Sequence, residues 1–426
     1  MLTYEGCTSL SDASGQLLAY SNGESIWDSQ HQMMPNGTAG LGGNNSTSQA
    51  ALLLPKPGDP TKAYLFCLDA IENNLVGGLR YSVVDFSLRG GLGDITATKG
   101  VILPTPTIGG KVTEKLAAVR HANGHDYWIV VHGWQSNAFY SFLFSSAGVS
   151  SAPVTSNVGA IHQGGGSFFG AGNAVGCMKA SPDGRHLALA QRDSQCELYD
   201  FDNATGSVSN YVRLASHDYT YGVEFSPDNS KVYTTYSLDG QITQYNLLAG
   251  SAAAIVSSAT LITSAERLGN LVLGPDNKIY VVSYGNSYLH VIDNPNATGT
   301  ACNYKTRAVT LAGKQGLNGL PNFANTYAAA VAPTPVPPTQ PLAVTIPNII
   351  TPNGDLQNEF FALKGLTPSD WHLSVFDRWG RQVYDQARYD NSWNAAGQAG
   401  GLYYYQLSNE ATGERYRGWV EVMRGS

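Results

Sequence analysis

Histidine is the residue type in this sequence that comes nearest to a reactive or metal-binding arrangement. His121, His125 and His132 lie close together in the chain, and imidazole nitrogens are common ligands of zinc, copper and iron. His121 and His125 flank a predicted turn, however, so exposed turn histidines are the interpretation we favour. His162 and His217 fall in predicted connections between strand units, but one histidine in each connection does not define a site. We therefore predict no catalytic residue, no metal ligand and no cofactor.

A glycine-rich stretch and a group of aromatic residues are two further candidates for binding. The stretch contains Gly164, Gly165, Gly166, Gly170 and Gly172. It lacks the strand-then-helix context of a phosphate-binding loop, so we interpret it as a flexible loop between strand units. The aromatic residues either line a carbohydrate site or fill the space between sheets, and their alternation favours the second interpretation. These residues are Trp128, Trp134, Phe139, Tyr140, Phe142 and Phe144.

A repeated turn-and-strand phrase predicts the elements that position these side chains. Its copies are Ser181–Ala190, Ser226–Thr235 and Gly274–Val282, with looser relatives at Ser11–Tyr20 and His121–Val131. Proline presets φ for the first turn position, and Asp-Gly or Asn tolerates the left-handed position that follows, so each copy predicts a hairpin. A second hairpin after each clear copy gives four strands per unit, about 45 residues apart. Residues 1–327 are therefore predicted to form a β-propeller of six to seven four-stranded blades, closed by Leu317–Phe323.

The chain changes character after this region. Residues 328–341 are rich in proline and are predicted to form an extended, semi-rigid linker. Residues 342–426 again alternate in the manner of strands, with Leu373–Asp377 in one predicted hairpin and Gly401–Leu407 in another. We predict an Ig-like β-sandwich of about seven short strands here, so the whole chain is expected to be all-β.

The composition agrees with a turn-rich, all-β protein. Charged residues make up 13% of the chain, which also contains 47 glycines and 24 tyrosines. The net charge is −7 and no basic run occurs, which argues against nucleic acid as a partner. No apolar run exceeds strand length, so no membrane span is predicted. The opening residues resemble the interior of a domain, and we expect the natural start, with any signal peptide, to lie upstream.

Five cysteines are present: Cys7, Cys67, Cys177, Cys196 and Cys302. None forms a C-x-x-C pair, so the sequence does not support a zinc or thioredoxin-like site. Two alternatives stay open for Cys177 and Cys196. They form a disulfide between neighbouring strands, or they are buried free thiols.

The C-terminal module carries several motifs in a fixed order. They are Ile350–Asp355, Val375–Tyr384, Ser392–Gly397, Gly401–Tyr405 and Gly418–Val422. Together they resemble the type B sorting domain of the type IX secretion system, also called the gliding-motility-associated C-terminal domain of Bacteroidetes. The resemblance implies that the module directs export through the secretion machinery and then holds the protein at the cell surface. The residues that match the motifs are Thr351, Pro352, Asn353, Gly354, Asp355, Asn358, Asp377, Arg378, Trp379, Gly380, Trp393, Asn394, Gly397, Gly401, Tyr403, Tyr404, Tyr405, Gly418 and Trp419.

The opening motif departs from the family pattern at one position. The family continues as Gly-Asp-Gly-x-Asn-Asp, whereas this chain has Leu356 in place of the third of these residues. Oxygen ligands from Asp355 and Asn358 could hold calcium, but we favour a turn capped by Asp and Asn side chains. The N-terminal module resembles the propellers that precede such domains in Bacteroidetes surface proteins, and this resemblance implies no specific activity. The matching stretches are Glu5–Asp12, Met34–Gly37, Leu54–Gly58, Glu114–Val119 and Gly319–Phe323.

Three functions remain open from the sequence. The favoured one is a secreted, non-enzymatic protein on the surface of a Gram-negative bacterium, with the propeller displayed for adhesion or interaction. Its expected partners are the secretion machinery and, further, surface glycans or other copies of the chain. The second is an extracellular filament subunit joined by strand exchange between propeller and C-terminal domain. The third is a propeller hydrolase or lactonase, which predicts a metal or acid–base cluster in the central channel.

Overall fold

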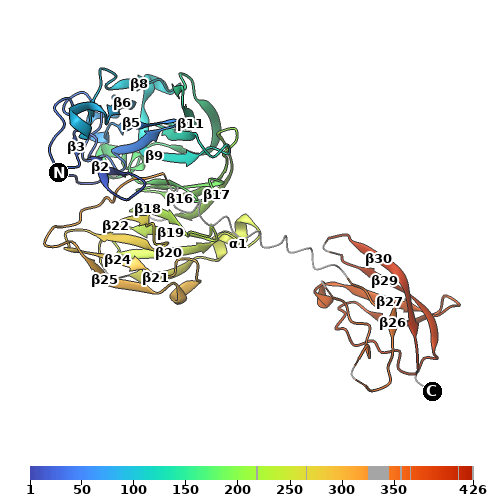
Figure 1. Cartoon of the computed structure of the whole chain (residues 1–426). Coiled ribbons are helices and arrows are strands. Elements are labelled where there is room, and N and C mark those ends of the chain that lie inside the picture. Colours follow the sequence, from blue (N-terminus) through green and yellow to red (C-terminus); the bar gives the residue numbers. More distant parts are fainter. Residues whose placement is uncertain are drawn as a thin grey trace. The chain divides into compact units, whose positions relative to one another are not determined.

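The computed structural model describes residues 1–216, 219–264, 266–324, 345–355, 357–364, 366–410 and 412–424, without the side chains of residues 215 and 216. The chain divides into two compact units, Met1–Val331 and Ala332–Ser426. The proline-rich residues 328–341, predicted to be a linker, lie outside the described residues. Figure 1 shows the first unit in blue to orange and the second in red.

The described part of the first unit is built from six antiparallel sheets, each formed by consecutive strands (Figure 1). The first sheet has β1 (Thr8–Ser11), β2 (Leu17–Ser21) and β3 (Ile26–Asp28). The second has β4 (Ala51–Lys56), β5 (Asp59–Leu68), β6 (Leu79–Asp85), β7 (Asp94–Ile95) and β8 (Val101–Leu103). The third has β9 (Val112–Arg120), β10 (Tyr127–Gly133), β11 (Ser136–Ser145), β12 (Gly148–Val149) and β13 (Val154–His162).

The other three sheets of this unit have four strands each. The fourth has β14 (Met178–Ala180), β15 (His186–Gln191), β16 (Gln195–Asp202) and β17 (Ser207–Ser216). The fifth has β18 (Thr220–Phe225), β19 (Lys231–Tyr236), β20 (Gln241–Asn246) and β21 (Thr260–Ser264), with helix α1 (Ala252–Ser257) before β21. The sixth has β22 (Leu268–Leu273), β23 (Ile279–Ser283), β24 (Tyr288–Ile292) and β25 (Tyr304–Thr310). This is the β-propeller predicted from the repeated phrase, with six blades.

Short 3-10 turns complete the described helices. They are Ile71–Asn73, Leu88–Gly91, Ile108–Gly110, Phe168–Gly170, Gly172–Ala174 and Gly299–Cys302 in the first unit and Pro368–Asp370 in the second. Among the described residues, no helix has the length and apolar character needed to cross a membrane.

The repeated phrase forms the turns that were predicted for it. The Gly184 amide donates to the Ser181 carbonyl at 2.8 Å, and Gly184 has a φ of 69°. Asn229 takes the same place in the next sheet, with a φ of 63° and a 3.0 Å bond to Ser226. Glycine and asparagine are the residues that adopt this left-handed conformation most readily, so the turn chemistry fixes where each hairpin reverses.

The propeller ring is closed by the segment predicted to close it. The Asn318 amide donates to Tyr4 O at 3.0 Å, while Asn318 O accepts from the Asn270 amide of β22 at 2.8 Å. Further along, Asn322 donates to the Cys7 carbonyl at 2.7 Å. The two ends of the unit therefore join the last sheet to the first through backbone hydrogen bonds.

The first sheet has three strands, and a loop covers its outer edge. Trp27 of β3 forms a bridge with Met33, and the Met34 amide donates to Ile26 O at 3.0 Å. In the filament hypothesis, a strand from another copy that joins this edge would have to displace the loop, because the loop already pairs with the edge.

Aromatic and aliphatic side chains fill the space between neighbouring sheets. Phe142 and Phe144 pack with Leu52 and Phe66 between the second and third sheets, while Trp128 and others pack between the third and fourth sheets. Burial of one such side chain contributes about 1.5–3 kcal/mol relative to exposure. Five of the six aromatic residues singled out in the sequence thus belong to the inter-blade core, as the alternation predicted, whereas Trp134 packs with Leu75 and Ala174 in a separate small cluster.

All five cysteines are buried free thiols. Cys177 precedes β14 and Cys196 lies in β16, and β15 lies between these two strands. The disulfide alternative is therefore wrong, because the two residues are not on neighbouring strands.

The second unit contains one five-stranded sheet in the order β26–β30–β29–β27–β28. Its strands are β26 (Ile349–Ile350), β27 (His372–Phe376), β28 (Gln382–Gln386), β29 (Gly401–Ser408) and β30 (Arg415–Val422). One face of the sheet packs on Phe361, Leu363, Tyr389 and Trp393. These residues belong to irregular segments, so five strands are present in the described part of this unit where about seven were predicted.

In the described part of this unit, side-chain hydrogen bonds hold the covering segments where the predicted sandwich would have a second sheet. The Tyr389 hydroxyl donates to Phe361 O at 2.7 Å and accepts from the Trp393 amide at 3.2 Å. The side-chain oxygen of Asn391, Oδ1, accepts a hydrogen bond from the Leu363 amide at 2.9 Å. Buried backbone groups in the covering segments are satisfied in this way without a strand ladder.

Candidate functional site

The hairpin turn between β27 and β28 holds a tryptophan in solvent. Asp377 Oδ1 accepts from the backbone amides of Trp379 at 2.9 Å and Arg381 at 3.0 Å, and Arg381 Nε donates to Asp377 Oδ2 at 3.1 Å. Gly380 supplies the left-handed position with a φ of 81°. The Trp379 side chain is 87% exposed. The turn is thus fixed by its own hydrogen bonds, while its largest side chain makes no contribution to the core.

Two motif glycines leave room for specific side chains. Gly418 lies opposite Tyr405 in the β29–β30 register, and a Cβ at Gly418 would lie 2.5 Å from the Tyr405 hydroxyl. A Cβ at Gly401 would lie 2.6 Å from Arg378 Nη2, and Gly401 has a φ of 138°. The Tyr405 ring therefore covers Gly418, and the Arg378 side chain approaches the Gly401 backbone.

Two other aromatic motif residues belong to the core of this unit. Trp393 and Tyr403 are both buried, and the Tyr403 hydroxyl donates to Ala399 O at 2.7 Å. Close by, the Asn394 side chain accepts from the Ala396 amide at 3.0 Å, and Gly397 has a φ of 72°. These motif residues build the fold of the unit.

The opening motif is a loop held by its own polar side chains. Asn353 Oδ1 accepts from the Asp355 amide at 3.1 Å, and Asp355 Oδ1 accepts from the Gln357 amide at 2.8 Å. Thr351 pairs with the Asn358 carbonyl at 2.8 Å. This is the arrangement that the capped-turn interpretation predicts. The hydrogen bond from the Gln357 amide is also the main cause that lowers the pKa of Asp355. In the described part of the chain no group of three or more His, Cys, Asp or Glu residues is placed to hold a metal.

Three large aromatic residues face outward from the sheet in direct register. Phe376 of β27 pairs with Tyr404 of β29, which pairs with Trp419 of β30. Tyr404 is 46% exposed and Trp419 is 47% exposed. The residues that flank Tyr404 along its strand, Tyr403 and Tyr405, point to the opposite face, because side chains alternate along a strand. The sheet thus presents an aromatic row on the face away from its core.

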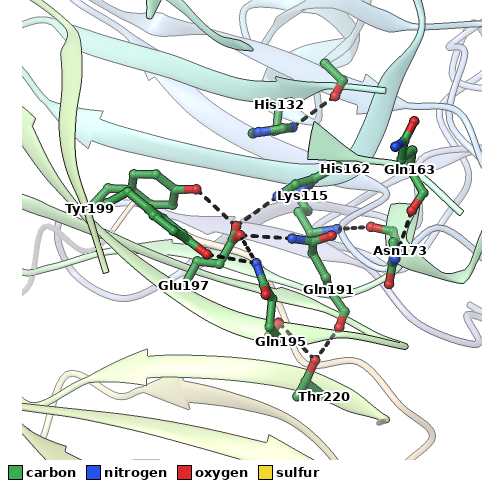
Figure 2. A network of polar contacts seen from close by, with 12 residues as sticks. Lys115, His132, His162, Gln163, Asn173, Gln191, Gln195, Glu197, Tyr199 and Thr220 are labelled. Atoms are coloured by element: carbon green, nitrogen blue, oxygen red, sulfur yellow. Dashed lines mark hydrogen bonds and ion pairs between the residues drawn. The ribbon is translucent and has the colours of Figure 1, made fainter. Parts of the chain in front are cut away.

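A buried polar network lies inside the propeller, between the third and fourth sheets (Figure 2). Glu197 of β16 is its centre. Its carboxylate accepts from His162 Nε2 at 2.9 Å, Gln191 Nε2 at 2.9 Å, the Tyr199 hydroxyl at 3.1 Å and Gln195 Nε2. A carboxylate offers about four acceptor positions, so these donors suit its ionised form. Burial raises the pKa of Glu197, whereas the bonds from Gln195 and Tyr199 lower it.

Two neutral histidines extend this network. The rings of His132 and His162 stack with centroids 3.6 Å apart, and both side chains are fully buried. Burial lowers the pKa of each well below 6.5. His132 Nδ1 lies 2.9 Å from Gly133 O, which can only accept, so Nδ1 carries the proton. His132 Nε2 and His162 Nδ1 have no hydrogen-bond partner among the described residues.

Lys115 of β9 connects the network to the glycine-rich loop. Its Nζ donates to the carbonyl oxygens of Asn173, Ala174 and Val175 at 2.9–3.2 Å. Burial lowers the pKa of Lys115 to about 8. Lys115, His132, His162 and Glu197 are each fully buried. The network joins two blades and one loop.

A carboxylate closes the glycine-rich loop from within the protein. Asp193 Oδ2 accepts from the amide and the hydroxyl of Ser167 at 2.7 and 2.6 Å. A carboxylate therefore occupies the place that an anion would take in such a loop. The segment lies between the third and fourth sheets, as predicted, and contains two short 3-10 turns. Hydrogen bonds of Lys115 and Asn173 hold it.

The structure separates the histidines that the sequence grouped. His121 and His125 lie at the turn between β9 and β10, as predicted, whereas His132 is buried beside His162. His217 lies outside the described residues. Sequence reasoning missed Lys115, Glu197 and the glutamines around it. Their spacing follows no motif, and only the pairing of β10 with β11 and β11 with β13 brings the two histidines together.

The fold defines a β-propeller followed by a separate sheet unit with an exposed aromatic face. Residues 344–422 match the family model of the CHU_C type IX secretion signal domain, which agrees with the resemblance seen in the motifs. Such a signal indicates export to the cell surface or the extracellular space. No curated protein matches the chain in sequence.

Several solved structures are similar to the chain at low identity. PorZ of Porphyromonas gingivalis, a surface component of the type IX secretion system, is 14% identical with a TM-score of 0.36; the match covers 100% of this chain and 57% of PorZ. The periplasmic gluconolactonase PpgL of Pseudomonas aeruginosa is 13% identical with a TM-score of 0.42, covering 87% and 96%. Hydrazine synthase of Kuenenia stuttgartiensis is 12% identical with a TM-score of 0.41, covering 73% and 84%. At these values the likenesses bear on neither activity nor partner.

Proposed function

We propose that this chain is a non-enzymatic surface protein of a Gram-negative bacterium, exported by the type IX secretion machinery through residues 342–426 and displaying its propeller for adhesion or interaction. The observation that carries the proposal is the secretion-signal match at residues 344–422. It is supported by the separate core of the second unit, which packs around Trp371, Trp393 and Tyr403. A signal that folds by itself can be recognised whatever body precedes it.

The export role is tested by deletion and by transfer. In the native host, the intact chain is expected at the cell surface, where added protease digests it in whole cells. A chain without residues 342–426 is expected to stay in the periplasm, and a periplasmic reporter that carries these residues is expected to reach the surface. Normal surface display of the deleted chain would contradict the proposal.

The absence of catalysis is the finer part of the proposal. Its support is that the carboxyl groups nearest the ring closure, Glu5 and Glu114, are buried and hydrogen-bonded within the protein. The test compares gluconolactone hydrolysis by the purified chain and by a Glu114→Gln variant of equal thermal stability, with and without added Ca²⁺ or Zn²⁺. The two proteins are expected to show the same rate. Turnover that this substitution abolishes would favour the hydrolase alternative instead.

A further inference from the structure

The outer face of the C-terminal sheet differs from an ordinary solvated face. An antiparallel sheet with one buried face usually carries polar residues on the other. Here the outer face carries the row Phe376–Tyr404–Trp419, with Leu402 and Ile349 at 36% and 37% exposure beside it. None of these side chains belongs to the buried core of the unit. Exposed apolar surface of this kind marks an interaction site in soluble proteins.

Arginines border the aromatic row along β30. Alternation places Arg415, Arg417, Trp419 and the exposed Glu421 on one face. The two arginines lie on one side of Trp419 along the strand, with Arg417 opposite Gln406, and Glu421 lies on the other side, paired with Ile349. Both arginines are exposed, and no ion pair within the described ranges involves either of them. Trp, Tyr and Arg are the residues that carry most of the binding energy in protein–protein interfaces. The composition of the face therefore favours a protein partner whose carboxylates meet the two guanidinium groups.

Trp379 adds a preorganised group in the turn of the same hairpin. Its backbone is fixed by Asp377 and by the left-handed Gly380. In the described part of the chain, the polar atoms of Trp379, Tyr404 and Trp419 side chains make no hydrogen bond within the protein. Because the backbone of the turn is already fixed, a partner that covers Trp379 has to order only its side chain. These three motif residues are exposed and lie outside the buried core of the unit.

We propose that this surface, defined by Trp379, Phe376, Tyr404, Trp419, Arg415 and Arg417 and here named the signal face, is where a protein of the type IX machinery binds the unit. The occupant is a protein surface with an apolar centre and carboxylates toward Arg415 and Arg417. The inference rests on the proposed export function. The buried motif residues, such as Trp393 and Tyr403, then serve the fold, while the exposed ones serve recognition.

The test compares full-length variants in the native host. The first variant combines Trp379→Ala, Tyr404→Ala and Trp419→Ala. It is expected to lower the surface-displayed fraction at least about tenfold, toward the level of the chain without residues 342–426. The combined Phe variant, W379F/Y404F/W419F, is expected to retain display because it keeps the apolar area. Phe169→Ala is the matched control, since Phe169 is fully exposed but lies in the propeller. Thermal unfolding of the purified proteins shows that each variant is folded.

The charge of the face is tested separately. Arg415→Glu with Arg417→Glu is expected to reduce display several-fold, whereas the double Lys variant is expected to reduce it less. If the folded Ala variant is displayed like the intact chain while the deletion stays in the periplasm, the signal face is overturned and the export function stands. If the deletion itself is displayed normally, the proposed function fails first. Sedimentation that shows a dimer abolished by the Ala variant, with display unaffected, would assign the face to a second copy and overturn the inference.

Discussion

Glu5 and Glu114 are held by the same hydroxyl group. Ser48 Oγ lies 3.1 Å from Glu5 Oε2 and 2.8 Å from Glu114 Oε2. The Ser48 hydroxyl has one proton, so it can donate a hydrogen bond to one of the two carboxyl groups. The other carboxyl group must be protonated and donate to the Ser48 oxygen. Glu114 also accepts from the backbone amides of Ser48 and Ile71, both at 2.9 Å. Glu114 is therefore the carboxylate, and Glu5 carries the proton.

The proton on Glu5 predicts a dependence of stability on pH. Burial, and then the charge of Glu114, raises the pKa of Glu5 from 4.5 to about 8. The folded chain thus binds this proton more tightly than the unfolded chain, so its stabilising effect is complete below pH 4.5 and is lost as the pH rises through about 8. The Tm difference between the intact chain and Glu5→Gln is expected to shift in favour of the variant between pH 5 and 8.

The comparison with Glu5→Gln is needed because other buried groups titrate near this range. His132 and His162 have lowered pKa values, so their effect on stability runs in the opposite direction below pH 6.5. Around Glu5 itself, Tyr221 and Cys177 are the further titratable neighbours, and burial raises the pKa of both. A Tm difference that stays constant from pH 5 to 8 would show that Glu5 is not the group that titrates.

The stacked histidines predict a loss of stability on the acid side. Each histidine is neutral when folded, because burial lowers its pKa well below 6.5. Unfolding lets both take up protons, so stability is expected to fall as the pH drops below about 6.5. His132→Phe removes one of these groups and keeps the edge-on ring contact with Phe139, whose centroid lies 4.6 Å away. Urea unfolding at pH 7 and pH 5 is expected to show a smaller difference for this variant.

Glu197 is expected to contribute more to stability than any exposed charge of the propeller. Replacing it with Leu leaves the donors of His162, Gln191, Gln195 and Tyr199 buried without their acceptor. Removing one partner of such a buried polar group costs about 3–5 kcal/mol. Urea unfolding measures this loss, and Glu197→Gln is the control, expected to lose less because it keeps one carbonyl oxygen. An equal loss for both variants would mean that volume, rather than hydrogen bonding, matters at this position.

Gly418 is expected to tolerate no side chain beneath Tyr405. A Cβ at Gly418 would meet the Tyr405 ring, and that ring is packed against Phe361 with centroids 5.0 Å apart. Gly418→Ala is expected to destabilise the second unit by about 1–3 kcal/mol. The double variant with Tyr405→Leu should recover part of this loss, because the shorter side chain frees the space. Calorimetry of the chain, with the unfolding of the two units followed separately, is the measurement; strict additivity of the two substitutions would contradict the contact.

The turns were predictable because their cause is local. Pro182, Asp183 and Gly184 set the dihedral angles of one hairpin by themselves, and the same chemistry recurs near Asn229. The secretion-signal motifs could be recognised for a similar reason, since each is a short run within one strand or turn. The count of strands in the second unit could not be predicted. Its covering segments alternate like strands, but they are held by the Tyr389 hydroxyl and the Asn391 side chain.

The sequence alone indicated the succession of hairpins, the position of the closing segment and the presence of an export signal. It left six or seven blades open, and the structure shows six sheets of three to five strands in the described part of the first unit. Only the tertiary structure decided which side chains meet. His132 joins His162 because two strands pair with β11, and Cys177 is kept from Cys196 because β15 lies between them. Dihedral preferences act over a few neighbouring residues, whereas the partners of a buried polar group are chosen by the stacking of whole sheets. The signal face was also decided by the tertiary structure. Alternation along β29 distinguishes two faces of the strand, but only the packing of the core shows which of them remains exposed.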